Sequence, residues 1–191
     1  MSSKNEHPEK KIAFLVEGCK QGNLSCQRQI FELFAGRILT VCRRYENRQT
    51  GAKDILQETF IKAFDKIGQF DPQKGRFEAW LKRIAINTAL KSLRGQTLTL
   101  PLQDADSSYT MNVETSASPD LREEQILQLI KELPTGYRTV FNLYVIDGYS
   151  HADIAKKLSI STQTSKSQLS KAKAKLRLKI QSIINQESES I

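Results

Sequence analysis

Apolar residues recur every three or four positions along most of the chain, which is the pattern of amphipathic helices. In the first half this spacing predicts four helices, over residues 12–22, 25–45, 52–70 and 77–94. Pro72 and Gly75 stand between the third and the fourth and favour a turn there. No segment alternates apolar and polar residues as a half-buried strand does, so the pattern predicts an all-α protein.

The second half begins with a segment that lacks any apolar period. Residues 95–119 are rich in Ser, Thr and Asp, a composition that predicts a flexible linker. Helical periodicity resumes at residues 120–133, where Asp120 is the expected N-cap and Pro134 ends the helix, and again at 136–148 and from 153 onward. The sequence therefore predicts two small helical domains, residues 1–94 and 120–191, joined by an acidic linker.

The stretch DIAKKLSISTQTSKSQLSKAK, residues 153–173, contains two helical segments separated by only three residues. In a helix-turn-helix the first helix packs behind the second, and the second enters the major groove of DNA. The packing needs apolar inner faces, which are expected at Ile154, Ala155 and Leu158, at Ile160 in the turn, and at Leu169, Ala172 and Leu176. The C-terminal domain is therefore predicted to be a helix-turn-helix.

The outer face of the second helix carries side chains that suit DNA. Gln can bond base edges, whereas Ser and Lys can hold phosphates. The expected DNA contacts are Thr162, Gln163, Lys166, Ser167, Gln168, Ser170, Lys171 and Lys173. A basic helix can also be the solvated face of an ordinary bundle, but the short turn with Ala155 and Ile160 around it favours DNA binding.

The distribution of charge indicates an anionic partner. The chain has 29 Lys and Arg against 21 Asp and Glu, a net charge of +8. Basic residues concentrate in 74–94 and 150–180, whereas 95–120 contains acids and no Lys or Arg. Two basic modules of this kind favour nucleic acid, with a membrane surface as the other anionic candidate.

Several classes of protein and site lack support in the sequence. No apolar run approaches the ~18–20 residues of a membrane span, and the polar N-terminus lacks a signal-peptide segment, so a cytoplasmic protein is expected. If Cys19 and Cys26 share a helix, they lie ~10 Å apart along its axis, beyond disulfide reach. Buried thiols are therefore expected rather than a metal site. Catalytic and cofactor motifs are also lacking, so neither an enzyme nor a cofactor is expected.

Two motif sets, in this order, resemble the sigma factors of bacterial RNA polymerase. AKDILQETFIKAFDKIGQF followed by GRFEAWLKRIAINTALKSLR is similar to their core-binding and promoter-melting domain, and residues 132–176 resemble their C-terminal DNA-binding domain. Two such domains with a short acidic linker resemble the small extracytoplasmic-function (ECF) class of the sigma-70 family. The resemblance implies a promoter-specificity factor that binds core RNA polymerase, recognises the minus-35 and minus-10 elements and initiates transcription.

The resemblance assigns roles to residues of the first domain. DILQETF matches the segment that docks on the clamp helices of the beta-prime subunit, so Asp54, Gln57 and Glu58 are expected to face the polymerase. Ile55 and Leu56 are expected to pack inward or at the rim of that interface.

FDPQKGRF and EAWLKRIAIN match the part that opens DNA at the minus-10 element, where an unstacked base is held in a loop pocket. The residues implied for this step are Phe70, Lys74, Arg76, Phe77, Lys82, Arg83, Asn87 and Arg94. Trp80 lies on the apolar stripe and is expected in the core.

Two positions depart from the common family pattern. Ser165 stands where Val is usual and is expected to weaken an inner contact, and Gln168 stands at an often basic position, so the promoter sequence stays open.

The resemblance also implies contact with the beta flap, a linker that follows the RNA channel of the polymerase, and an anti-sigma factor as a further candidate partner. A stand-alone helix-turn-helix regulator and an RNA-binding helical protein are the alternative functions.

Overall fold

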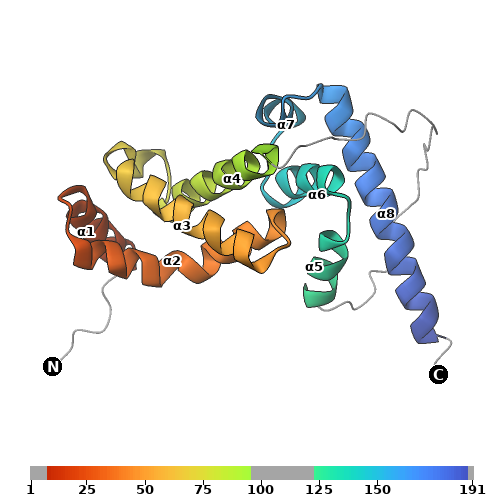
Figure 1. The fold of residues 1–191 in the computed structure, drawn as a ribbon, viewed down its shortest axis with the longest axis horizontal. Helices are drawn as coiled ribbons and strands as arrows, with labels where there is room; N and C mark the ends of the chain where they lie inside the picture. The colour runs from red at the N-terminus through yellow and green to blue at the C-terminus, as the bar shows by residue number, and fades with distance from the viewer. Residues whose placement is uncertain (1–7, 96–122, 189–191) are drawn as a thin grey trace. The chain divides into compact units, whose positions relative to one another are not determined.

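A computed structural model of the chain describes residues 8–95 and 123–188. Within these ranges every regular element is a helix or a helical turn and no strand occurs, so the predicted all-α class is confirmed (Figure 1). The chain divides into two compact units, Met1–Gly95 and Gln96–Ile191, called here unit 1 and unit 2. The predicted linker, residues 95–119, lies outside the described residues except for Gly95, which ends a helix.

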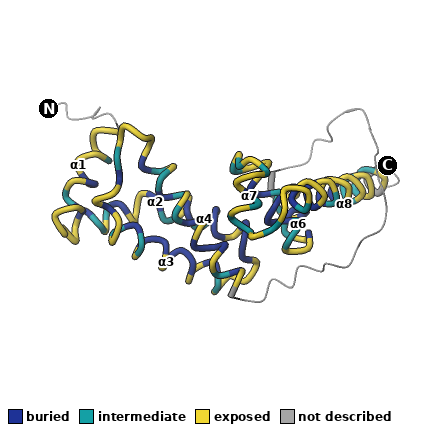
Figure 2. Tube along the Cα trace, turned by 90° about the horizontal axis from the view of Figure 1, so that it is seen from above, coloured by how far each residue is buried: buried dark blue, intermediate teal, exposed yellow. Residues whose placement is uncertain are grey.

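Unit 1 is a bundle of four helices, α1 (Pro8–Lys20), α2 (Leu24–Tyr45), α3 (Gln49–Asp65) and α4 (Phe77–Gly95). Two short 3-10 turns, Ile67–Gln69 and Pro72–Lys74, connect α3 to α4. Figure 2 shows that buried positions follow the inner sides of α2, α3 and α4. These helices bury the apolar stripe that the sequence predicted, including Ile30, Ile38, Ile55, Leu81 and Leu93.

The α1–α2 corner decides whether Cys19 and Cys26 share a helix. α1 ends at Lys20 and α2 begins after Asn23, whose side chain accepts hydrogen bonds from the amides of Ser25 and Cys26 at 2.9 and 3.1 Å. Cys19 and Cys26 therefore belong to different helices, and the distance calculated for a shared helix does not apply. Both thiols are free and buried, as is Cys42.

Burial determines the chemistry of these thiols. It raises the pKa of Cys19 to about 11 and that of Cys42 to about 12. Thiols with such pKa values stay protonated at neutral pH, and the thiolate is the form that reacts and binds metals. Both side chains therefore act as small apolar core residues.

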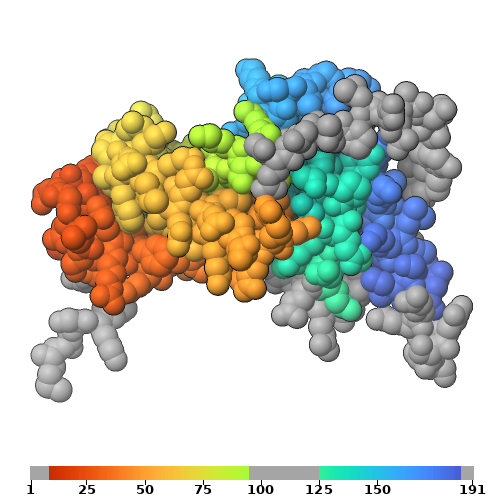
Figure 3. Space-filling view, viewed as in Figure 1, coloured from red at the N-terminus to blue at the C-terminus, as the bar shows by residue number. Residues whose placement is uncertain are grey.

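Unit 2 contains α5 (Glu123–Lys131), α6 (Thr135–Phe141), α7 (His151–Leu158) and the long α8 (Thr162–Ser188). A π-helical turn, Asn142–Ile146, continues α6, so the predicted single helix over 136–148 changes its hydrogen-bond pattern halfway. A core cluster joins α5 to the middle of α8 through Leu129, Ile130, Leu133, Ala172 and Leu176. Figure 3 shows one face of each unit in space-filling form, coloured along the chain.

The end of α5 is held by a buried polar contact. Arg138 of α6 is 5% exposed, and its Nη1 donates to the carbonyl oxygens of Lys131 and Leu133 at 2.8 and 3.4 Å. Carbonyls at a helix C-terminus lack partners within the helix, and a guanidinium satisfies them. None of the described helices combines the length and the apolar content that crossing a membrane would require.

Candidate nucleic-acid and polymerase interfaces

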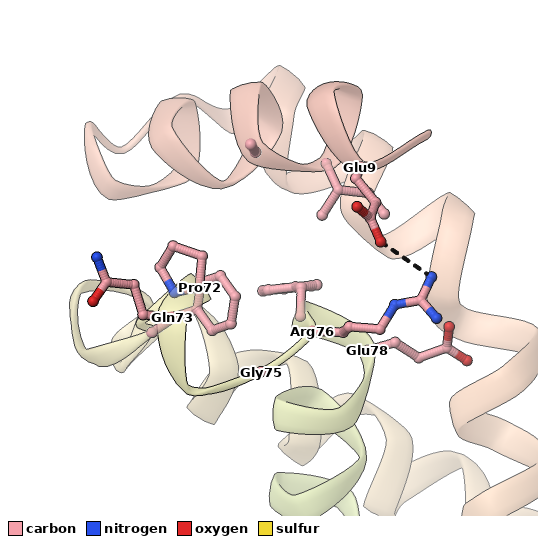
Figure 4. Close-up of a pocket in the computed structure, with 10 residues that line it drawn as sticks. Glu9, Pro72, Gln73, Gly75, Arg76 and Glu78 are labelled. Carbon is pink, nitrogen blue, oxygen red and sulfur yellow. Dashed lines mark ion pairs between the residues drawn. The ribbon is translucent and has the colours of Figure 1, made fainter. Parts of the chain in front are cut away.

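Unit 1 contains a pocket between the start of α1 and the loop that leads into α4 (Figure 4). Its volume is about 290 Å³. The lining residues come from α1 and from the segment between Phe70 and Glu78: Glu9, Ile12, Ala13, Phe70, Pro72, Gln73, Gly75, Arg76, Phe77 and Glu78.

The loop wall of this pocket is built by local backbone chemistry. The Asp71 carboxylate accepts a hydrogen bond from the Gln73 amide at 2.9 Å, and Pro72 opens a short 3-10 turn. Gly75 ends the turn with a backbone φ of 138°, a conformation that residues with a Cβ atom rarely adopt. The loop therefore has a defined shape before any ligand is present.

Aromatic rings form the inner side of the pocket. Phe70 and Phe77 are buried, and their ring centroids lie 5.3 Å apart in an edge-to-face arrangement. Trp80 packs on both of them, with 5.5 Å between centroids in each pair. Trp80 is only partly buried and was expected in the core, so the prediction holds for its packing but not for its burial.

Ion pairs surround the mouth of the pocket. Arg76 lies 3.5 Å from Glu9 of α1, and Lys74 lies 3.4 Å from Asp71 (Figure 4 shows the first pair). Both cations are about 80% exposed, and such exposed pairs contribute little to stability. Either cation can therefore exchange its carboxylate for an incoming phosphate at small cost.

The outward side of α4 carries a basic stripe next to this pocket. Arg83, Asn87 and Arg94 are all exposed, whereas Lys82 is partly buried. Spacings of four and seven residues place Arg83, Asn87 and Arg94 on one side of the helix, over ~16 Å of its axis. Lys91, which was not among the predicted contacts, is also exposed and completes the stripe.

Three pocket residues of α1 were missed by the sequence analysis: Glu9, Ile12 and Ala13. The apolar stripe of α1 continues from Cys19 through Leu15 and Val16 to Ile12. Leu15, Val16 and Cys19 are buried, but Ile12 is only partly covered. The position of Ile12 on the apolar stripe was the only sequence signal for this wall of the pocket. The sequence could not show what Ile12 faces, because the opposite wall comes from segment 70–78, far along the chain.

The predicted polymerase-docking segment lies on α3 and divides into two faces. Asp54, Gln57 and Glu58 are exposed, while Ile55 and Leu56 are buried at 3% and 8% exposure. The two apolar residues therefore hold α3 in the bundle and present the polar face, consistent with the inward packing that was expected. Glu58 already pairs with Lys62 one turn later, at 2.6 Å.

Unit 2 forms the predicted two-helix arrangement of α7 and α8. Ser159 ends α7 in the left-handed conformation with φ of 56°, and the amide of Ile160 donates to the carbonyl of Ala155 at 3.1 Å. Ser161 then caps α8, because its Oγ accepts from the Thr164 amide at 2.9 Å. Ile154 is fully buried behind this turn.

The outward face of α8 contains most of the predicted DNA contacts. Exposed positions are Thr162, Gln163, Lys166, Ser167, Ser170 and Lys173, and Lys171 is partly exposed. Leu169, Ala172 and Leu176 are buried on the opposite side, as predicted. The helix is thus amphipathic with its basic side in solvent.

Gln168 is a correction to this set. It was expected on the outer face, but it is 9% exposed, and its Oε1 has no hydrogen-bond partner among the described residues. It follows Ser165 by three residues and precedes Ala172 by four, which places all three on one side of the helix. Gln168 is therefore a buried polar residue, and a base edge cannot reach it without rearrangement.

Comparisons with known proteins match two regions of the chain, one in each unit. Residues 30–99 match the family Sigma-70 region 2, and residues 123–176 match Sigma-70, region 4. The chain is 30% identical to the ECF RNA polymerase sigma factor SigW of Bacillus subtilis over 81% of its own length and 88% of that protein. It is 28% identical to the ECF RNA polymerase sigma-E factor of Haemophilus influenzae, covering 89% of this chain and 95% of the relative.

The fold has a counterpart among solved structures. The sigma factor RpoE of Bartonella quintana, crystallised with the anti-sigma factor NepR, aligns over 82% of this chain and 96% of its own at 20% identity, with a TM-score of 0.50. The matched regions contain the α3 face, the loop wall of the pocket, α7 and the first part of α8, whereas the α1 wall of the pocket lies outside them. The chain therefore belongs to the sigma-70 family as a member of its ECF class, the promoter-specificity factors that direct bacterial RNA polymerase to promoter DNA.

Proposed function

We propose that the pocket of unit 1 takes up one unstacked base of the minus-10 element. The observation that carries this proposal is the combination of an aromatic inner wall with exposed cations at the mouth. Bases leave a duplex only when their stacking is replaced, and stacking on aromatic side chains contributes ~1–3 kcal/mol per base. Phe70 and Phe77 line the pocket at 9% and 4% exposure, so their rings must shift to present a face to the base, and Trp80 packs on both of them.

The basic stripe of α4 holds the strand that the pocket opens. Arg83, Lys91 and Arg94 can neutralise successive phosphates, and Asn87 can donate a hydrogen bond to a base or a phosphate. Arg76 joins this path at the mouth of the pocket, once a phosphate replaces Glu9. Single-stranded DNA is thus bound by charge along α4 and by stacking in the pocket.

The polar face of α3 docks on the beta-prime clamp helices of core polymerase. Asp54, Gln57 and Glu58 lie on consecutive turns and are all exposed. Carboxylates on such a face suit a partner surface that is partly basic. The buried Ile55 and Leu56 position this face without touching the partner.

Unit 2 recognises the minus-35 element as double-stranded DNA. α8 enters the major groove, where Gln163 reads a base edge and Lys166, Lys171 and Lys173 hold phosphates. The same unit contacts the beta flap of the polymerase. The chain performs no catalytic step of its own, because the polymerase makes the RNA, and it acts in the cytoplasm where that enzyme works.

A stand-alone helix-turn-helix regulator would use α7 and α8 in the same way. It would give no role to the aromatic pocket or to the polar face of α3. A pull-down with core polymerase separates the two functions, since only a sigma factor co-elutes with it.

The division of labour between the units is tested on a promoter mapped by run-off transcription of genomic DNA with reconstituted holoenzyme. Arg83→Ala with Arg94→Ala should leave duplex binding nearly intact and abolish the permanganate reactivity of thymines near the start site. Lys166→Ala should instead weaken duplex binding. Arg28→Ala, which removes an exposed arginine of α2, is the matched control and should change neither. The same defect from both sets of variants would contradict the proposal.

A further inference from the structure

His151 is the first residue of α7, directly after its N-cap Ser150. Its Nδ1 lies 2.9 Å from the Oγ of Ser165, a fully buried residue of α8. Ser165, which stands where Val is usual in the family, therefore does more than weaken an apolar contact. It is a polar anchor for a histidine on the preceding helix.

A second contact fixes the plane of the same ring. His151 stacks on Tyr144 of the π-helical turn, with centroids 4.4 Å apart and planes inclined by 22°. Stacking and the Ser165 hydrogen bond together leave little freedom to the imidazole. Among the described residues no partner is seen for Nε2, so one ring nitrogen stays available to a ligand.

The charges around His151 belong to the DNA-facing side of unit 2. Lys166 and Lys173 of α8 both act on the imidazole, and with partial burial as the main cause they lower its pKa. On its own helix the nearest acid is Asp153, which already accepts a hydrogen bond from Ser150 at 2.6 Å. The group thus sits in a positive potential that an anion would relieve.

We propose that the Nε2 of His151 binds a phosphate of the minus-35 DNA backbone, with Ser165 and Tyr144 as positioning residues. In a helix-turn-helix the first helix crosses the backbone while the second lies in the groove, which brings the start of α7 near phosphates. This inference rests on the proposed role of α8 in binding duplex DNA. It adds a contact from α7 that depends on protonation.

Protonation does not break the anchor of the ring. In the imidazolium, Nδ1 donates to the Ser165 oxygen, and the hydroxyl can accept as well as donate. A phosphate favours the charged form, so DNA binding raises the pKa of His151 and takes up a proton as the pH falls. The contact then gains the strength of a charge-assisted hydrogen bond.

The test measures the binding of the full-length chain to a short duplex of mixed sequence, by fluorescence anisotropy across a salt series. A phosphate contact is independent of sequence, so the promoter need not be known. For the wild-type chain, the slope of log affinity against log salt should steepen by about one between about pH 8 and about pH 6, since each neutralised phosphate adds ~0.9. At low salt and the lower pH, His151→Gln should bind about tenfold more weakly than wild type.

Three variants make the outcome decisive. His151→Gln should lose the pH dependence of the slope, and His7→Gln, which removes the other histidine, should keep it. Lys166→Ala should lower the slope by about one at both pH values. Unchanged pH dependence in His151→Gln overturns the phosphate contact, whereas an unchanged slope in Lys166→Ala overturns the role of α8 instead. Circular dichroism at both pH values verifies folding, and His151→Asn replaces the Gln variant if that one unfolds.

Discussion

Unit 1 buries Arg44, Glu46, Thr59 and Thr88 among many aliphatic and aromatic side chains, whereas unit 2 buries Arg138, Thr139, Asn142, Ser165 and Gln168 within a much smaller apolar core. In unit 1 the buried apolar residues far outnumber the buried polar ones, and three aromatic rings support the pocket. In unit 2 a guanidinium closes the end of α5, and a serine anchors a histidine at the start of α7.

The difference shows two ways to present a DNA-binding surface. Apolar packing is insensitive to pH but sensitive to lost volume, because a cavity removes contacts that nothing replaces. Buried hydrogen bonds respond to protonation and to the loss of one partner. Unit 1 should therefore lose stability when an aromatic ring is removed. Unit 2 should lose stability when a buried hydrogen-bonding group is protonated or removed.

Removing a ring from the pocket wall should have the largest effect. Phe77 is 4% exposed and packs on Phe34, Phe70 and Trp80. Phe77→Ala should lower the free energy of unfolding of unit 1 by ~3–5 kcal/mol. Urea titration followed by fluorescence measures this directly, because Trp80 is the only tryptophan.

Phe14 supplies the control for that substitution. It is 73% exposed on α1, so Phe14→Ala should change the stability by no more than ~0.5 kcal/mol. Equal losses from the two variants would show that the pocket wall is not part of the core of unit 1.

Removing acids from the α3 face should weaken the complex with polymerase and leave unit 2 unaffected. Asp54→Ala with Glu58→Ala should cost on the order of 2 kcal/mol in binding to core enzyme, because charges at a docked interface lose their partners. Affinity is measured by competition for core polymerase. Glu17→Ala with Glu32→Ala removes the same charge from exposed positions on α1 and α2 and should have no effect. Co-elution of the α3 variant at wild-type strength would refute the docking assignment.

Two glutamines of α8 should respond in opposite ways. Gln168→Leu removes a buried acceptor that has no partner in the part of the chain that the structure describes, so unit 2 should gain on the order of 1 kcal/mol in stability while duplex binding stays unchanged. Gln163→Leu should leave stability unchanged and cost ~1–3 kcal/mol on cognate minus-35 sites. Thermal denaturation and anisotropy separate the two effects. If Gln168→Leu lost the ability to discriminate between DNA sequences, Gln168 would have to be assigned to base recognition after all.

The smallest expected effect is a pH dependence confined to unit 2. Burial and nearby lysines lower the pKa of His151 from its ordinary value of 6.5. The unfolded chain therefore takes up the proton first as the pH falls, so the stability of unit 2 should decrease below about pH 6.5. His151→Gln should flatten this decrease, measured as the urea midpoint of unit 2 against pH. The Trp80 signal of unit 1 is the internal reference, and a parallel shift of both units would argue against His151 as the source.

The helices themselves were largely predictable because their apolar period is long and regular. The pattern placed α2 and α4 within a residue or two, along with the inner face of α8. The change from α-helix to π-helix at Asn142 was not predictable, since both patterns bury similar faces over a single turn. Candidate residues that share one helix, such as Asp54 and Glu58, could also be grouped from the sequence, because their spacing alone places them on one face.

By itself, the sequence determined the all-α class, the order of the two motif sets and the basic faces of α4 and α8. These features depend on the helical period and on local charge. Only the tertiary structure decided that Glu9 and Ile12 meet Phe70 and Phe77 around one pocket, because that contact joins segments about sixty residues apart, and helical periodicity carries no information on such distances. It likewise decided that Gln168 is buried and that His151 rests on Ser165. Each depends on how closely one helix approaches its neighbour, and the volumes and hydrogen bonds at that contact set the approach.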